Sequence, residues 1–487
     1  MKLTDILKLI KADENLQLYD NSGYLDEWAE WYSGTVKSWH NYKVYNGKRH
    51  VQMHRLSLNM AKKICEDWAN LLVNEKTDIT LSNPEAQKNL ELILKKNRFW
   101  RKANQDIEKM MALGGVAWCV SVENLPINAD GSIIDGGTVK ISSVNAKNIV
   151  PITIEDDVIT ECAFWRIDTG RTYITAHVKN DAGNYEIHNI IAQGVDLNNL
   201  TFDPDTDQYY IFDTHNNIPW FVCLKPNVVN NVDINSPLGI SIFANAIDCL
   251  KEIDLIFDSY ANEFILGKKR IFVNAEQMAF NSLGEQVEVF DSNDVVMYQL
   301  PTSADGSLTI QDVTQSLRVT EHQTALQSQL NNLAASCGLG TEHYKFDKSG
   351  VSTATQIVSE NSQLFRNIKK HEIIIEEALT ELVEAIIYAA NTFTQTKINA
   401  TADDIAISFD DSIIEDKATE MANDRLDVSL GVLSKAEYRA KWYNEDLQTA
   451  QRMIEEIDGF TIDDSEGYAY DDTDTGAQMD GQGTEGA

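Results

Sequence analysis

The middle of the chain, residues 239–395, constrains the fold most, because long helical patterns there enclose a segment of different character. Apolar residues recur at helical spacing from about Ser241 to Leu266, and again from about Ser352 to Thr392. At ~1.5 Å per residue, the second pattern predicts a helix about 60 Å long if it is straight. Few compact enzymes need a helix of that length, whereas a large ring assembly does.

The segment between the helical patterns is acidic and is expected to be rich in β-structure. Residues 271–317 contain no Lys or Arg. A second helix is expected after this segment, and a loop from Gly338 to Gly350 then leads into the longest helix. The acidic residues of the segment are Glu276, Glu285, Glu288, Asp291, Asp294, Asp305 and Asp312.

Length and composition indicate an ordinary globular protein of several domains, because 487 residues exceed what one hydrophobic core usually holds. No apolar run approaches the ~18 residues that span a membrane, and the first residues lack the apolar core of a signal peptide. The six cysteines form no CxxC pair, so we expect reduced thiols rather than a zinc site. These features predict a protein that stays in the cytoplasm where it is made.

The net charge of −34 is the strongest compositional signal. It argues against a sequence-specific reader of nucleic acid, which normally presents a basic face. Two explanations stay open at equal weight. The charge either keeps the protein soluble, or forms a negative wall that lets DNA pass without binding it tightly.

The N-terminal half predicts helices followed by an antiparallel β region, which places the chain in the α+β class. Helices are expected through most of the first hundred residues, including 58–75, with a short strand at 78–81. Period-two patterns separated by turn dipeptides predict strands over 116–191. Residues 193–217 are polar and are expected to form a loop, and 220–224 a further strand.

The C-terminal part predicts a strand, two helices and a tail. The strand is expected at 405–409 and the helices at 416–430 and 434–457. Ser434 and Glu437 match a capping box at the start of the last helix. Beyond Gly459 the chain is rich in Asp, Gly and Thr and is expected to be disordered.

Motifs that carry catalysis are missing from the sequence. There is no phosphate loop, nucleophile elbow, zinc-protease motif or dinucleotide fingerprint. We therefore predict no catalytic residue, no metal site and no cofactor, and a protein that is not an enzyme. One enzymatic alternative stays open, a metal-dependent nuclease that uses Asp410 and Asp411, although a turn and helix cap is the preferred interpretation of this pair.

Aromatic residues are concentrated near the N-terminus and are flanked by Lys43, Lys48, Arg49 and Arg55. They could stack on the bases of a single strand, but packing in the core or between subunits is the preferred explanation. The residues are Trp28, Trp31, Tyr32, Trp39, Tyr42 and Tyr45.

Several segments form a recognisable pattern through their order and spacing. They lie at residues 31–34 (WYSG), 57–75, 353–382, 409–413 (FDDSI) and 431–439 (GVLSKAEYR). Over about residues 24–457 the chain resembles the portal proteins of tailed bacteriophages, of the kind found in long-tailed phages of Gram-positive bacteria.

The resemblance implies a portal-like α+β fold, repeated in a ring of about twelve subunits, a homododecamer, at one vertex of the capsid. Its parts are an α/β wing, a two-helix stem, a small α/β clip, a long spine helix and a C-terminal helical crown. On this chain the wing is expected at 1–238, the stem helices at 239–267 and 312–336, the clip at 268–311, the tunnel loop at 337–352, the long wing helix and strand at 353–416, the crown at 417–457 and a disordered acidic tail at 458–487.

The resemblance also implies a function and partners. Such a ring conducts double-stranded viral DNA during packaging and ejection, without sequence specificity, and nucleates procapsid assembly. The implied partners are the terminase large subunit, the major capsid and scaffolding proteins, and head-completion, adaptor or tail proteins, with no membrane. The protein is expected to assemble in the host cytoplasm and to end in the virion. Another virion structural protein without a DNA channel, such as a minor head or baseplate component, is the alternative.

Two groups of candidate site residues follow from the resemblance. The DNA-facing residues of the tunnel loop would be His343, Tyr344, Lys345 and Lys348. The two lysines would form a positive collar around the ring, or would pair locally with Glu342 and Asp347, and both interpretations stay open. The partner-binding residues of the clip would be Glu276, Glu285, Glu288, Asp291 and Asp294.

Overall fold

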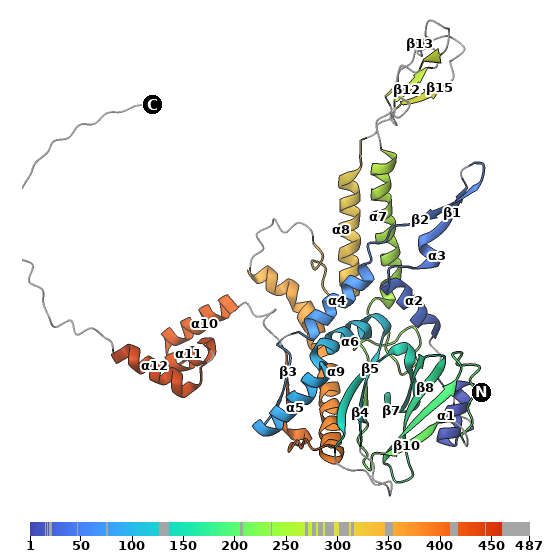
Figure 1. Ribbon diagram of the computed structural model, residues 1–487. Helices are drawn as coiled ribbons and strands as arrows, with labels where there is room; N and C mark the ends of the chain where they lie inside the picture. Colours follow the sequence, from blue (N-terminus) through green and yellow to red (C-terminus); the bar gives the residue numbers. More distant parts are fainter. Residues whose placement is uncertain are drawn as a thin grey trace, which may run out of the picture. The chain divides into compact units, whose positions relative to one another are not determined.

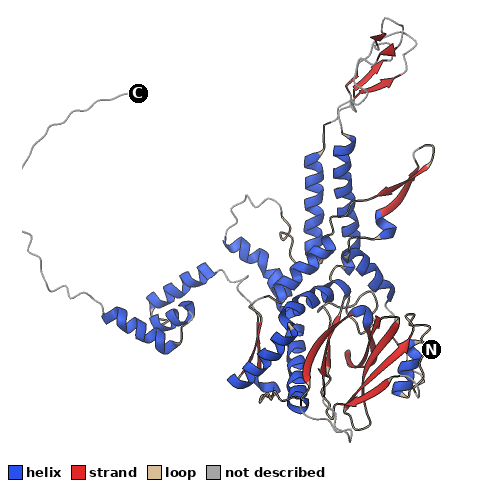
Figure 2. Cartoon of the chain, viewed as in Figure 1, coloured by secondary structure: helices blue, strands red, loops and turns tan. Residues whose placement is uncertain are grey.

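The computed structural model places the chain in two compact units, residues 1–410 and 411–487. Helices and strands are both abundant (Figure 1; Figure 2), so the predicted α+β class is confirmed. The residues that the structure describes are 1–14, 16, 18, 22–45, 47–74, 76–125, 136–204, 208–234, 236–267, 271–274, 279–280, 286–287, 297–300, 311–312, 316–345, 354–409, 417–443 and 445–459.

A five-stranded antiparallel meander forms the largest sheet of the first unit. Its spatial order is β10–β9–β8–β7–β6. Tight turns join its first strands: Asp156-Asp157 and Thr169-Gly170 all have positive φ, as the right-handed twist of a two-residue hairpin requires. The strands are β6 (Ile149–Glu155), β7 (Val158–Asp168), β8 (Arg171–Lys179), β9 (Tyr185–Gln193) and β10 (Tyr209–Asp213).

Helix α1 (Leu3–Lys11) packs on this sheet through its apolar stripe. Leu3, Ile6 and Leu7 are buried against side chains of the strands, and the Lys11 ammonium lies 2.6 Å from a carboxylate oxygen of Glu161. This helix agrees with the helices expected through most of the first hundred residues.

A second sheet contains β4 (Val116–Glu123) between β11 (Phe221–Leu224) and β5 (Thr138–Asn145), all antiparallel. The aromatic rings of Phe164 and Tyr185 on the large sheet meet Phe221 edge to face, with centroids 5.7 and 6.2 Å apart. This contact joins the two sheets through one buried cluster.

Helices α5 (Pro84–Asn97) and α6 (Phe99–Leu113) pack beside the second sheet, and α4 (Met60–Leu72) packs on α6. Asn83 caps α5 by accepting from two backbone N–H groups, and proline occupies its first turn. Gly114 ends α6 at φ 75°, where a Cβ would lie 2.5 Å from the carbonyl oxygen of Gly239. The glycine is therefore needed both for the turn and for this close approach.

The longest helix, α9 (Ala354–Phe393), has 40 residues, close to the expected range. It contacts β4, β5, β11 and α4, and buries Ile375, Leu379, Leu382 and Ile386 almost completely. After α9, β17 (Ile405–Ser408) pairs antiparallel with β3 (Asp78–Leu81), which joins segments more than 300 residues apart in sequence.

Two antiparallel helices, α7 (Ile247–Leu266) and α8 (Val319–Ser336), precede and follow the acidic insert. Within the insert, β12 (Ile271–Asn274) pairs parallel with β15 (Met297–Leu300) and antiparallel with β16 (Gln311–Asp312). A second small pair is β13 (Ala279–Phe280) with β14 (Gln286–Val287). The expectation of a helix from 312 is wrong at its start, because Asp312 still pairs with β12 and the helix begins at Val319.

One further expectation is wrong: residues 193–217 are not all loop, because 209–213 form edge strand β10. Strand β6 is not among the individual strands expected within 116–191, which are 116–122, 139–143, 158–167, 172–178 and 185–191. The hairpin of β1 (Asn41–Tyr45) and β2 (His50–His54), which follows α2 (Ser22–Tyr32) and the short α3 (Lys37–His40), was not expected either.

The second unit contains three helices among its described residues: α10 (Lys417–Leu430), α11 (Lys435–Tyr443) and α12 (Leu447–Gly459). The single helix expected over 434–457 is therefore two. The predicted capping box is confirmed, since Ser434 N–H donates to Glu437 at 2.9 Å and Glu437 N–H donates to the Ser434 hydroxyl at 3.1 Å. The tail beyond Gly459 lies outside the described residues.

Across the residues with a described placement, no helix combines the length and the apolar character that crossing a membrane requires.

Candidate functional site

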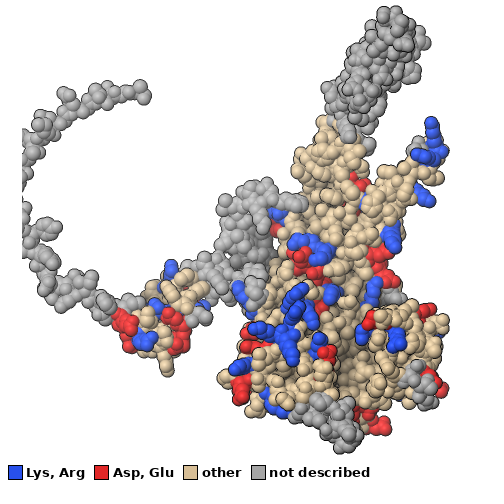
Figure 3. All heavy atoms as spheres, viewed as in Figure 1, with Lys and Arg blue, Asp and Glu red and all other residues tan. Residues whose placement is uncertain are grey.

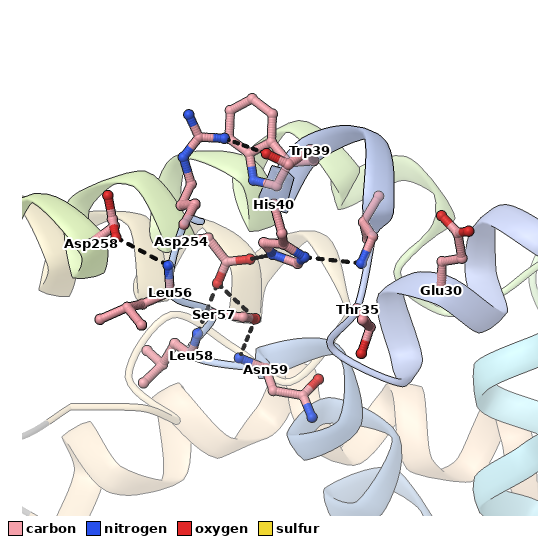
Figure 4. A network of polar contacts seen from close by, with 12 residues as sticks. Glu30, Thr35, Trp39, His40, Leu56, Ser57, Leu58, Asn59, Asp254 and Asp258 are labelled. Atoms are coloured by element: carbon pink, nitrogen blue, oxygen red, sulfur yellow. Dashed lines mark hydrogen bonds and ion pairs between the residues drawn. The ribbon is translucent and has the colours of Figure 1, made fainter. Parts of the chain in front are cut away.

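A buried polar network attaches the N-terminal segment to α7 (Figure 4). The imidazole of His40 accepts a hydrogen bond from Val36 N–H at Nδ1, at 2.9 Å, so its Nε2 carries the proton and donates to Asp254 at 3.0 Å. The second oxygen of Asp254 accepts from Leu58 N–H at 2.8 Å and from the Ser57 hydroxyl at 3.1 Å. His40 and Asp254 are both almost fully buried, so the network is sheltered from water.

A second carboxylate, one turn further along α7, extends the attachment. Asp258 accepts from Leu56 N–H at 3.0 Å and from the side-chain amide of Asn262 at 3.1 Å. On the hairpin side, the Arg55 guanidinium donates to the Trp39 carbonyl at 2.7 Å and stacks on the Trp39 ring at 3.8 Å. The base of hairpin β1–β2 is thus fixed on α7 by hydrogen bonds that are largely buried.

Helices α7 and α8 contact each other along their length through mixed polar and aromatic pairs. The Arg318 guanidinium donates to Glu263 at 3.0 Å, and the His322 ring lies edge-on to Tyr260 with centroids 5.8 Å apart. Near the other end, the Cys249 thiol lies 3.3 Å from the Gln329 carbonyl oxygen. The pair forms a two-helix element that carries the insert between its helices.

The loop after α8 is anchored on three helices. The Trp68 indole N–H of α4 donates to the Cys337 carbonyl at 3.0 Å, and the Asn367 amide of α9 donates to the Gly338 carbonyl at 2.8 Å. Gln327 of α8 donates to the Tyr344 carbonyl at 3.2 Å. Residues 338–345 therefore have a defined position rather than extending from the subunit.

Asp67 of α4 is the centre of this anchoring. It accepts from the Tyr344 hydroxyl at 2.8 Å and lies 3.5 Å from His343 Nε2. Burial raises the pKa of Asp67, but the hydrogen bonds from His343, Lys63 and Tyr344 outweigh burial and lower it overall. Burial and the same carboxylate raise the pKa of Tyr344, so its hydroxyl stays a donor.

The predicted tunnel-loop residues fall into two groups. His343 and Tyr344 lie against Asp67 on α4. The Lys345 ammonium lies 2.7 Å from Glu342, which is the local pairing considered as the alternative to a collar. An exposed pair of this kind contributes little to stability, so it does not fix the lysine in place. Lys348 lies outside the described residues.

The remaining predicted site residues are also outside the described part of the chain. They are the clip residues Glu276, Glu285, Glu288, Asp291 and Asp294, together with Asp410 and Asp411 of the nuclease alternative. Among the residues that are described, no group of three His, Cys, Asp or Glu side chains could hold a metal ion.

The aromatic residues near the N-terminus mostly pack inside the unit. Trp28 and Trp31 are buried, and the Tyr32 hydroxyl donates to Glu108 at 2.5 Å. Trp39 stacks with Arg55, whereas Tyr45 on the hairpin is exposed. Packing in the core therefore explains why Trp28 and Trp31 are aromatic. The exposed hairpin that carries Tyr45 is a surface distinct from that core.

A cavity of about 720 Å³ lies between the two sheets and is lined by Phe164, His177, Trp220 and small polar side chains. Burial lowers the pKa of His177 to about 3, so its ring is neutral at physiological pH. Its Nδ1 atom is buried and has no hydrogen-bond partner among the described residues.

The sequence analysis missed the network around His40 and Asp254, although α7 held a signal for it. Asp254 and Asp258 are four residues apart, beside Ile253 and Phe257 of the apolar pattern, so both fall on a face that packs. Buried carboxylates need hydrogen-bond donors. The donors come from residues 36–58, about 200 positions away, and spacing alone does not reveal them.

Comparison with known proteins gives one family. The model for the family described as phage portal protein, SPP1 Gp6-like, matches residues 14–459. No curated protein matches the chain.

Solved structures with a similar arrangement include a chain from the virion of a native gene transfer agent particle, 11% identical, with a TM-score of 0.44, covering 90% of this chain and 98% of that one. Another comes from the neck of a native gene transfer agent particle computed with C12 symmetry, 12% identical, with a TM-score of 0.38, covering 78% of this chain and 87% of that one.

Proposed function

The chain belongs to the SPP1 Gp6-like family of phage portal proteins, and we propose on that basis that it forms a ring at one vertex of a phage capsid. The ring serves as the conduit through which double-stranded DNA enters and leaves the head. The observation that carries the proposal is the family match over residues 14–459, most of the chain. A subunit number of about twelve is the expectation for such a ring.

Within the ring, α7 and α8 are proposed as the stem and the insert between them as the clip. The insert has its own small sheet, in which β12 lies between β15 and β16. This sheet supports the proposal that the insert is a small module at the end of a two-helix element. Its acidic residues, among them Glu285 and Glu288, are proposed to dock the terminase motor and later the head-completion proteins. The crown is proposed at 417–457, in the separate second unit.

The loop 337–352 is proposed as the tunnel loop that narrows the channel. Because His343 and Tyr344 hold it on α4 through Asp67, we assign them the role of positioning the loop. Lys345 and Lys348 are then the proposed DNA-facing residues. A negative channel with a few cations suits a conduit, because DNA must slide without strong attachment.

The mass of the purified particle tests the proposal. Mass photometry over a range of salt concentrations should give one dominant species at a multiple of the 54.7 kDa subunit mass, close to twelve subunits. A protein that stays monomeric at every salt concentration, with capsid and scaffolding proteins also present, would refute it. An open-ended series of masses would instead indicate a different virion component.

A further inference from the structure

Hairpin β1–β2 has an apolar face that the described part of the subunit covers only in part, because Tyr42 and Val51 are half-buried while Val44 and Met53 are exposed. Its register places Tyr42 opposite Met53, and Val44 opposite Val51. Because side chains alternate along a strand, these four lie on one face. Val44 is 46% exposed and Met53 39% exposed. A two-stranded hairpin by itself is marginally stable in water, so a covering partner is expected.

The hairpin is also the basic part of an acidic chain. Residues 31–65 contain seven Lys or Arg and no Asp or Glu, whereas the whole chain has a net charge of −34. Figure 3 shows basic side chains gathered at the end of the hairpin. The partner of this surface should therefore be acidic and partly apolar.

Helix α7 has a surface with these properties. It contains five acidic residues and one lysine. Its exposed large apolar side chains are Leu255 (47%), Phe264 (47%) and Ile265 (58%), and Glu252 beside Leu255 is exposed as well. Lys251 pairs with Asp248 at 2.9 Å, which leaves Glu252 as the excess charge next to Leu255.

The hairpin does not cover Leu255 in its own chain, because that side chain is 47% exposed. The base of the hairpin is bonded to Asp254 and Asp258. A helix turns by about 100° per residue, so Glu252 lies about 160° around α7 from Asp254, while Leu255 lies about 60° from Asp258, at the edge of that contact. The network around His40 and Asp254 thus holds the hairpin off the surface that Glu252 and Leu255 form. Two complementary surfaces at different places on one subunit are what a heterologous contact between copies needs.

We propose that the hairpin of one copy docks on the α7 surface formed by Glu252 and Leu255 of the next copy. The apolar face around Val44 and Met53 covers Leu255, and the basic residues of the hairpin lie near Glu252. Repetition of a heterologous contact closes a ring when the rotation between copies allows it. The proposal rests on the proposed ring and assigns one of its subunit contacts.

Photo-crosslinking tests which surface the hairpin contacts. A benzophenone amino acid at position 44 should produce covalent dimers and higher ladders on a denaturing gel after irradiation of the assembled protein. Mass spectrometry should locate the partner peptide within residues 247–266. Crosslinks to another region, or no crosslinked dimers in a protein that forms rings, would overturn the proposal.

A matched pair of variants gives an independent readout. Val44→Asp with Met53→Asp should reduce the ring fraction by about tenfold or more, as loss of a central apolar contact does. The melting temperature of the monomer should stay unchanged, because both side chains are exposed. Val195→Asp, a 54% exposed valine in the connection after β9, is the control and should assemble normally.

The outcomes separate this contact from the ring itself. If the native protein forms no ring, the proposed function fails and the contact fails with it. If native protein and hairpin variant assemble equally, only the contact is wrong. A variant that assembles normally but loses binding to a short DNA duplex in a gel-shift assay would instead identify the hairpin as a nucleic-acid surface, which also overturns the proposal.

Discussion

Asp254 shows how a single buried carboxylate can organise distant segments. It accepts three hydrogen bonds, from His40, Ser57 and Leu58, while almost completely buried. All three donors come from the segment on either side of the hairpin, whereas Asp254 belongs to α7. The residue therefore determines how the hairpin is oriented relative to the helix.

Replacing Asp254 with Asn should destabilise the protein, because an amide has one acceptor oxygen where the carboxylate has two. The amide N–H would face either the His40 Nε2–H or the donors at Ser57 and Leu58. We expect a loss of about 2–3 kcal/mol in the free energy of unfolding, measured by chemical denaturation. Asp248→Asn on the same helix, where the side chain is 94% exposed, is the control and should change it by less than about 0.5 kcal/mol. Equal effects of the two variants would contradict the role given to Asp254.

His371 makes stability depend on pH. It is buried on α9, accepts from Asn227 N–H at 3.1 Å and packs edge-on to Trp68. Burial, with a smaller contribution from Lys370, lowers the pKa of His371 from 6.5 to about 4. The folded protein therefore favours the neutral ring, and this stabilisation is present above pH 6.5 and is lost as the pH falls toward 4.

His371→Gln should weaken that pH dependence, because glutamine does not titrate. Between pH 7.5 and 5 the native protein should lose about 2 kcal/mol through this histidine, and the variant should lack that part of the decline. Denaturant titrations at several pH values measure it. His215→Gln, at a histidine that is 70% exposed, should keep the native slope. If all three proteins have the same slope, His371 does not contribute.

At the scale of elements, the sequence predicted what depends on periodicity and missed what depends on long-range pairing. The helical patterns of α4, α7 and α9 and the turns at Thr169-Gly170 are local, so each was recognised. Strand β10 was missed because Tyr209 and its neighbours occupy an exposed sheet edge among polar residues. Hairpin β1–β2 was missed because its apolar face is only partly covered by the residues that the structure describes.

In the candidate site, too, local features were predicted from the sequence and long-range contacts were not. The loop after Cys337 was located from its glycines, which have φ of 81° and 86° at Gly338 and Gly340. Its anchoring was not predictable, because Asp67 and Tyr344 are 277 residues apart and belong to no local motif. Of the residues that were predicted to face DNA as one group, His343 and Tyr344 are therefore anchors and Lys345 is exposed, while Lys348 lies outside the described residues.

Tyr344→Phe should loosen the loop without unfolding the subunit. The change removes the hydroxyl that donates to Asp67 and leaves a buried carboxylate with one donor fewer, at a cost of about 1–2 kcal/mol. Hydrogen exchange of residues 338–345 should become faster, while exchange in α9 stays unchanged. Tyr443→Phe, at an exposed tyrosine of the second unit, is the control. Unchanged exchange in the loop would show that Asp67 does not hold it.

At the scale of the whole molecule, we propose a separate task for each part of an acidic ring. In this proposal the stem helices and the hairpin hold neighbouring copies together, the acidic insert receives protein partners, and the loop after α8 faces the channel. The net charge of −34 suits such a conduit, because DNA should pass it without tight binding.

Lys345→Ala with Lys348→Ala tests the channel part of this account. Rings should assemble as in the native protein, because neither lysine belongs to the proposed contact between copies. The length of packaged DNA, or its retention after packaging, should change, because a positive collar is removed. Lys435→Ala with Lys441→Ala, a double change in the second unit, controls for the loss of two charges. If packaged length and retention both match the native values, the collar does not exist.

We propose that copies of this chain close into a ring around an open channel. Electron microscopy of the purified protein, viewed end-on, tests this most directly. We predict closed rings of about twelve subunits with a central opening. Compact single subunits, or closed particles without an opening, would contradict it.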